Sequence, residues 1–306
     1  MTTTSATDAP GEFRAAATDL SERLRSGIFK GPVIDLAFDD AESGVHWGED
    51  GAATIGAFTT IEAIAADARL AAAYPGIAAT AAGLATPQIR HLATLGGNLA
   101  QRSRCWYYRH PHIGCLKKGG DTCPARAGNH LYHVAFDNGP CIAPHPSSMA
   151  AALLAYEATV TTDRRGGLSI ADLLGDGSDG ASDHALAQGE IVNSVALPPP
   201  VASERALYKR AISRSYAEWP LAEVCARAVV ADGRFRFVRI AAGGVAPRPL
   251  RLAASEALLL GAEANAETIG EAARRATTDS NPLPMTAYKL DLLIGVVNDL
   301  LERLAG

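Results

Sequence analysis

Residues 86–148 read TPQIRHLATLGGNLAQRSRCWYYRHPHIGCLKKGGDTCPARAGNHLYHVAFDNGPCIAPHPSS. A glycine turn, Thr94-Leu95-Gly96-Gly97-Asn98, lies in the first half of this stretch. Four of the chain's five cysteines follow it: Cys105, Cys115, Cys123 and Cys141. Because paired glycines let a backbone approach a ligand closely, we predict a ligand-binding turn followed by a loop that gathers four sulfur atoms.

The cysteine spacing, C-x9-C-x7-C-x17-C, leaves three interpretations open. Four thiolates from one loop suit an iron–sulfur cluster or a tetrahedral zinc ion. The close cysteine pairs typical of zinc loops are missing, which favours the cluster. Disulfide-bonded or unligated cysteines are the third interpretation, but the N-terminus MTTTSATDAPGEF has no basic segment followed by an apolar one that would indicate secretion.

Other residues near the cysteines have simpler interpretations. His110, His112, His130, His133 and His145 lie close to the cysteines in sequence. With four thiols available, we interpret these histidines as hydrogen-bonding or surface residues. We expect the fifth cysteine, Cys225, which lies in a distant apolar run, to be an ordinary buried thiol.

Composition excludes several classes of protein. The chain has 306 residues, of which 48% are hydrophobic, so it can bury a full core and more than one is expected. Its formal net charge is −5 and no basic stripe is present, which argues against nucleic-acid binding. No apolar run approaches the roughly 20 residues of a membrane span. No catalytic triad or acid–base pair stands out, so we predict no catalytic residue in this chain.

The periodicity predicts an α+β fold. Residues 1–12 are small and polar and are expected to form a disordered tail. A first domain is predicted over residues 13–175, with the cysteine loop at 101–145, and a second over 190–306. Apolar runs at 206–212, 223–230 and 235–242, the last two joined by an Asp-Gly turn, predict a three-stranded antiparallel sheet. Helices predicted at 253–261, 266–277 and 286–304 would back this sheet.

Several motifs together resemble the FAD-binding (medium) subunit of molybdenum hydroxylases of the xanthine dehydrogenase family. The segment ATLGGNL at 93–99 is similar to that family's second flavin loop, and Gln-Ile-Arg precedes it at 88–90. A Pro-Ser-x-Met-Ala helix start at 146–150, Tyr208-Lys209 and AGGVAP at 242–247 extend the resemblance along nearly the whole chain. It implies a two-part N-terminal flavin-binding domain and a C-terminal three-stranded sheet with a helix bundle.

The cysteine loop narrows the resemblance. It is similar to the insertion of the periplasmic aldehyde oxidoreductase and 4-hydroxybenzoyl-CoA reductase branches, whose flavin subunit carries a 4Fe–4S cluster. The resemblance therefore implies that the four loop cysteines, Cys105, Cys115, Cys123 and Cys141, ligate such a cluster.

The resemblance also implies which residues contact FAD: Thr18, Asp19, Thr94, Gly96, Gly97, Asn98, Ser147 and Lys209. The chain departs from the family pattern in its first flavin loop, where AAATDL at 15–20 replaces AGGT(D/N)L. Ser148 also stands where the family usually has Asp. If either missing glycine needs a positive φ, alanine is strained there by about 1 kcal/mol or more.

The function implied is that of an electron-transfer subunit carrying a 4Fe–4S cluster and FAD. Its partners would be a molybdenum-cofactor large subunit and a 2Fe–2S small subunit, as a heterotrimer or its dimer. Because the first flavin loop departs from the pattern, a second hypothesis is a cluster-bearing relay or structural subunit without FAD. A zinc-stabilised binding module is a third. We expect a cytoplasmic location, or a periplasmic one if a partner carries the export signal.

Overall fold

The computed structural model describes residues 11–37, 42–215 and 217–306. Residues 1–10 of the predicted tail lie outside this range. Gly11 and Glu12 do not belong to a disordered tail, because β1 (Glu12–Arg14) pairs in parallel with β2 (Val33–Asp35). Helix α1 (Leu20–Arg25) connects these two strands.

The first domain contains a five-stranded antiparallel sheet in the order β3-β4-β7-β5-β6. Its strands are β3 (Val45–Trp47), β4 (Ala53–Gly56), β5 (Thr159–Thr162), β6 (Leu168–Ser169) and β7 (Val192–Leu197). Its helices are α2 (Ile61–Ala66), α3 (Ala68–Ala73), α4 (Pro75–Gly83), α5 (Pro87–Leu92), α6 (Leu95–Leu99), α8 (Ser148–Ala155) and α9 (Ile170–Leu174). Strand and helix side chains share one hydrophobic core.

Strand β7 corrects the predicted start of the second domain. We predicted that this domain begins at residue 190, but Val195 on β7 pairs with Ile55 on β4 and with Val160 on β5. All three side chains are fully buried in the first core. The first domain therefore continues to the proline run at 198–200, and the second begins with β8.

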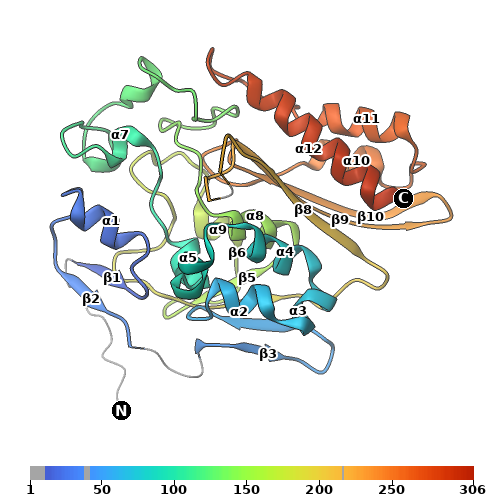
Figure 1. The fold of residues 1–306 in the computed structure, drawn as a ribbon, viewed down its shortest axis with the longest axis horizontal. Coiled ribbons are helices and arrows are strands. Elements are labelled where there is room, and N and C mark those ends of the chain that lie inside the picture. Colours follow the sequence, from blue (N-terminus) through green and yellow to red (C-terminus); the bar gives the residue numbers. More distant parts are fainter. Residues whose placement is uncertain (1–10, 38–41, 216) are drawn as a thin grey trace.

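The second domain is a four-stranded antiparallel sheet in the order β11-β10-β9-β8. The three predicted strands are β8 (Arg205–Ala211), β9 (Ala222–Ala231) and β10 (Arg234–Gly243), and a two-residue strand, β11 (Leu250–Arg251), adds an edge. Helices α10 (Ala253–Leu259), α11 (Ala266–Arg275) and α12 (Tyr288–Ala305) follow (Figure 1). None of the helices in the described residues is long and apolar enough to span a membrane.

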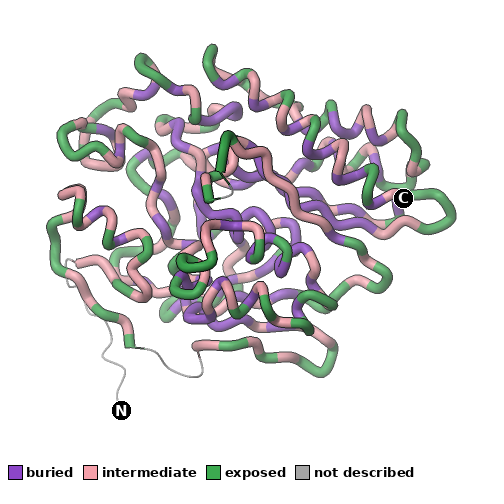
Figure 2. The backbone as a smooth tube through the Cα atoms, in the orientation of Figure 1, coloured by how far each residue is buried: buried purple, intermediate pink, exposed green. Residues whose placement is uncertain are grey.

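Strand β9 is buried on both faces, which explains its nearly continuous apolar sequence. Val224, Ala226 and Ala228 point into the core formed with the C-terminal helices. Cys225 points the other way, into the core of the first domain, and its thiol is free and completely buried, as predicted. Figure 2 shows this continuous buried layer running between the two domains.

A buried arginine on β9 ties the two domains together. Arg227 pairs with Glu204 at 2.6 Å, and both side chains are at most 5% exposed. The same guanidinium donates to the carbonyl of Ala155 at 2.8 Å and lies 3.9 Å from the ring centre of Tyr156. Both of these partners belong to the end of α8 in the first domain.

Replacing Arg227 by methionine should lower the free energy of unfolding by about 3–5 kcal/mol, because Glu204 would remain buried without its partner. The matched control is Arg239→Met, which removes an exposed contact to Glu157 and should cost at most about 1 kcal/mol. Urea unfolding of the two variants measures the difference. Equal costs would show that Arg227 does not anchor the domains.

Candidate cofactor site

A groove of about 290 Å³ lies where the predicted flavin residues converge. The N-terminal segment around α1 contributes Thr18 and Asp19, and α6 contributes Gly97 and Asn98. Ser148 and Arg210, which were not among the predicted contacts, also line the groove. The structure therefore brings the two predicted flavin loops together, although they are far apart in sequence.

The glycine turn forms the first turn of α6. The Thr94 hydroxyl caps this helix by accepting from the Gly97 N–H at 3.2 Å. The Gly96 N–H donates to the Ala57 carbonyl at 2.8 Å, and a Cβ on Gly96 would lie 3.0 Å from the Ala57 Cβ. Gly96 is therefore needed for close packing, while the exposed Gly97 opens the groove.

The backbone N–H groups of this turn are already bonded within the protein. Leu95 and Asn98 donate to the carbonyls of Thr59 and Thr94, at 2.9 and 2.8 Å. In this conformation the turn offers a ligand the open surface of Gly97 and the side chain of Asn98, rather than a row of free N–H donors.

Asn98 is held by the start of α8. The Ser147 hydroxyl donates to Asn98 Oδ1 at 2.6 Å and accepts from the Ala150 N–H at 3.0 Å. Ser147 itself is 1% exposed and supports the groove from behind. Its neighbour Ser148 lines the groove instead.

Lys209 lies away from the groove. Successive side chains of a strand point to opposite faces, and Lys209 on β8 points toward α12, where it pairs with Asp299 at 2.9 Å. The next residue, Arg210, lines the groove. Lys209 itself therefore does not line the groove.

The first flavin loop contains a strained alanine. Ala17 has φ = 59°, in the left-handed region that favours glycine, whereas Ala16 does not. Thr18 follows as an exposed residue on the groove. The missing glycine at position 17 therefore leaves the backbone conformation in place at an energetic cost.

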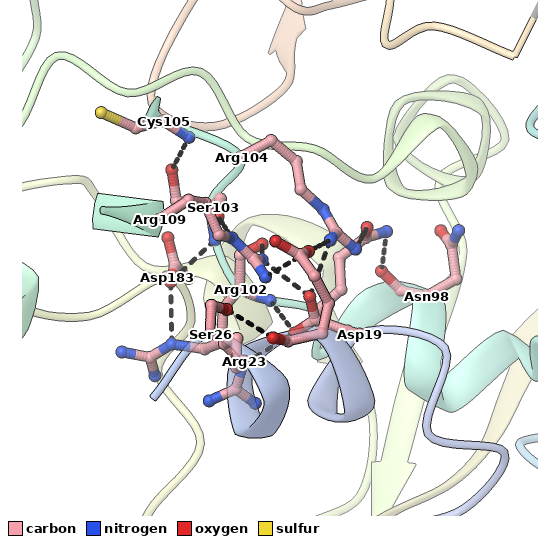
Figure 3. A network of polar contacts seen from close by, with 12 residues as sticks. Asp19, Arg23, Ser26, Asn98, Arg102, Ser103, Arg104, Cys105, Arg109 and Asp183 are labelled. Atoms are coloured by element: carbon pink, nitrogen blue, oxygen red, sulfur yellow. Dashed lines mark hydrogen bonds and ion pairs between the residues drawn. The ribbon is translucent and has the colours of Figure 1, made fainter. Parts of the chain in front are cut away.

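Asp19 binds the N-terminal segment to the cysteine loop (Figure 3). It accepts from Arg109 at 2.7 Å and pairs with Arg104 at 2.9 Å and with Arg23 at 3.1 Å. Burial opposes ionisation of Asp19, but these cations outweigh it and hold the pKa of the carboxyl below its usual value. The backbone N–H of Arg102 also donates to this carboxylate at 3.1 Å.

The four loop cysteines line one cavity. Cys105, Cys115 and Cys123 each come directly before a short helix, namely α7 (Trp106–Arg109) and the 3-10 helices η2 (Leu116–Lys118) and η3 (Pro124–Arg126). Cys141 follows in the segment after η3. All four thiols are free, and Cys115 is buried while the others are half-buried. The rest of the lining is Tyr107, Tyr108, Leu116, Lys117, Pro124 and Ala143.

The thiols interact with one another. Cys141 is hydrogen-bonded to Cys123, which lowers the pKa of Cys123 to about 5 and raises that of Cys141. Burial raises the pKa of Cys105, whose sulfur lies 3.2 Å from Nε2 of His133. Burial also lowers the pKa of His133 to about 4. This histidine hydrogen-bonds to a loop cysteine, in line with the role expected for it.

A second carboxylate, which is buried, also holds the loop. Asp183 pairs with Lys117 at 2.8 Å and with Arg102 at 3.0 Å, and its side chain is 5% exposed. Although burial opposes ionisation, these two cations hold the pKa of Asp183 below its usual value. Sequence reasoning missed Asp183, because nothing in a Gly/Asp/Ser-rich segment marks one acidic residue as buried.

The loop also has its own core and docks on the second domain. Ala125, Val134 and Ile142 form a small buried cluster. Lys289 on α12 donates to the carbonyls of Tyr132 and Gly244, at 3.2 and 2.8 Å. Within the described residues, no group of three or more His, Cys, Asp or Glu side chains is arranged to hold a single metal ion.

The fold resembles that of solved oxidoreductase and dehydrogenase structures. A chain of quinoline 2-oxidoreductase from Pseudomonas putida 86 superposes with a TM-score of 0.76 at 19% identity, covering 98% of this chain and 91% of that one. A chain of the carbon monoxide dehydrogenase from Hydrogenophaga pseudoflava gives a TM-score of 0.74 at 19% identity, covering 96% and 89%. These likenesses define the class of fold.

Sequence comparison defines the family. Residues 39–200 match the FAD binding domain in molybdopterin dehydrogenase, and residues 206–304 match the CO dehydrogenase flavoprotein C-terminal domain. The aldehyde oxidoreductase FAD-binding subunit PaoB of Escherichia coli (strain K12) is 33% identical over 227 residues, which cover 72% of this chain and 70% of that one. The chain belongs to the family of FAD-binding subunits of molybdopterin dehydrogenases.

Ala17→Gly should stabilise the protein by up to about 1 kcal/mol, because glycine adopts a positive φ without strain. Ala16→Gly is the matched control, and it should destabilise by about 0.4–1 kcal/mol by increasing the freedom of the unfolded chain. The shift of the urea midpoint in each variant measures both effects. Destabilisation by Ala17→Gly would contradict a strained loop.

Proposed function

We propose that this chain is the electron-transfer subunit of a molybdenum-containing oxidoreductase, with FAD in the groove and a 4Fe–4S cluster in the cysteine cavity. The observation that carries the cluster assignment is that Cys105, Cys115, Cys123 and Cys141 all line one cavity, although 35 residues separate the first from the last. Such convergence is expected of ligands to one group.

The sequence spacing of the cysteines favours a cluster over a single ion. A tetrahedral zinc ion needs four ligand atoms about 2.3 Å from one point, which requires a compact ligand group. A 4Fe–4S cluster takes one cysteine per iron and so accepts sulfurs that stand farther apart around a cavity. The wide sequence spacing suits this second arrangement.

The groove suits FAD for two reasons. Part of its wall, from Leu84 to Ser148, lies within the segment that matches the flavin-binding family, and residues from both proposed flavin loops line it. Trp219, which is half exposed, lines it together with Ile89 and Ala93 and supplies apolar surface for a flat ring system. Thr18, Asn98, Ser148 and Arg210 supply polar contacts.

The groove and the cavity are adjacent along the chain. Arg104 lines the groove and the next residue, Cys105, lines the cavity. When bound, a flavin and a cluster supply electron transfer, whereas the chain supplies their placement and electrostatic surroundings. Lys117 lies in the cavity wall, where its positive charge would offset the negative charge of four thiolates.

The partners follow from the family. The Escherichia coli relative is named as one subunit of an aldehyde oxidoreductase. By analogy, we propose that the present chain assembles with a molybdenum-cofactor large subunit and a 2Fe–2S small subunit. Substrate oxidation would then occur in the large subunit.

Cofactor analysis of the anaerobically purified complex tests this assignment. Cys115→Ala should remove iron and acid-labile sulfide relative to the wild type, because Cys115 is a cavity ligand in the proposal. Cys225→Ala is the matched control, since this buried thiol lies in the sheet and its loss should leave the iron content unchanged. The iron of a 2Fe–2S partner is common to both variants and cancels.

Three results would revise the proposal. Zinc in place of iron, or equal iron in wild type and Cys115→Ala, would contradict the cluster. Iron without flavin would favour the second hypothesis, a cluster-bearing relay or structural subunit that has lost FAD. About one FAD per subunit, released by acid and measured by fluorescence, supports the groove assignment.

A further inference from the structure

A second cavity of about 350 Å³ lies beside the cysteine loop and shares Arg104, Glu218, Trp219 and Pro220 with the groove assigned to FAD. It is an open cavity between this loop and the segment that joins β8 to β9. Trp106, Tyr132 and Trp219 line it, and we call it the aromatic pocket. The remaining lining residues are Arg104, Cys105, His133, Pro144, Ser213, Arg214, Glu218, Pro220 and Leu221. Trp106, Tyr132 and Cys105 do not line the groove assigned to FAD.

The three aromatic side chains of the pocket are unusually exposed. Trp106, Tyr132 and Trp219 are 38%, 43% and 50% exposed, whereas most large apolar side chains in the described residues are buried. Trp106 meets Tyr132 edge to face, with ring centres 5.4 Å apart and planes at 75°. Exposed apolar surface that lines a concave site marks a binding site more often than it marks a packing defect.

Two arginines, Arg104 and Arg214, line the aromatic pocket together with the three rings. The Arg104 guanidinium lies 4.6 Å from the ring centre of Trp219. The side chain of Arg214 is exposed, and its backbone N–H donates to the Glu218 carboxylate at 3.0 Å. Guanidinium groups donate hydrogen bonds and have no acceptor, so they suit carbonyl oxygens on a ligand.

We propose that the aromatic pocket binds a flat conjugated ring that carries carbonyl oxygens, the chemical class of the quinones. Flat aromatic faces favour stacking with a planar ring, and the pocket volume suits a ligand of two or three fused rings. Arg214 would donate to a ring carbonyl. Because Cys105 lines the same pocket, the bound ring would stand next to one of the proposed cluster ligands.

Equilibrium dialysis of the purified complex with 2,3-dimethyl-1,4-naphthoquinone tests the proposal. The methyl groups of this probe block the ring positions at which free thiols add. We expect saturable binding that Trp106→Ala weakens about tenfold, the effect typical of losing one stacking partner. Trp106→Phe keeps a flat ring and should bind within about twofold of the wild type.

Two controls separate the aromatic pocket from other sites. Ile89→Ala alters only the FAD groove, and Trp47→Phe alters an aromatic contact with Tyr74 in the first domain. Both should leave binding unchanged. The proposal is overturned if the complex shows no saturable binding, or if Ile89→Ala weakens binding and Trp106→Ala does not. Binding is measured without reference to iron or flavin, so its failure leaves the cofactor assignments standing.

Discussion

The site depends on the ion pairs that two carboxylates, the half-buried Asp19 and the buried Asp183, form with the cysteine loop. A long loop with only short helical turns cannot be ordered by backbone hydrogen bonds alone. Asp19 holds it from the N-terminal segment through Arg104 and Arg109, and Asp183 holds it through Lys117 and Arg102. The Asp183–Lys117 pair is buried and the other pairs are half-buried, and both carboxylates accept several bonds, the condition under which charge pairs fix a conformation.

The ion pairs of Asp19 and Asp183 place the groove and the cysteine cavity next to each other. Asp19 lines the groove and positions Arg104 there. Asp183 positions Lys117 at the cysteine cavity. Asp19, which was predicted to contact the flavin, therefore also holds the cysteine loop in place. Such sharing couples the order of the N-terminal segment to the order of the cysteine loop, although the two are far apart in sequence.

Much of the fold follows from the sequence. Alternating apolar runs and the Asp232-Gly233 turn predicted β9 and β10 and their hairpin, and amphipathic spacing predicted the C-terminal helices. The motifs predicted a ligand-binding role for the glycine turn and a ligand role for the four loop cysteines. The direction in which the Lys209 side chain points depends on Asp299, and the burial of Asp183 depends on Lys117. These partners lie far away in the sequence, so no local pattern predicts either feature. The prediction that β7 belongs to the second domain was wrong for the same reason, since its partner strands β4 and β5 lie in distant segments.

The family and the fold do not depend on which cofactors the chain binds. The central proposal is a cluster held by Cys105, Cys115, Cys123 and Cys141. Crystals of the complex, with diffraction recorded above and below the iron absorption edge, test that claim most directly. An anomalous difference peak for iron in the cavity between these four cysteines is the predicted result. A peak that appears only above the zinc edge, or an ordered cavity with no anomalous peak, would contradict the account.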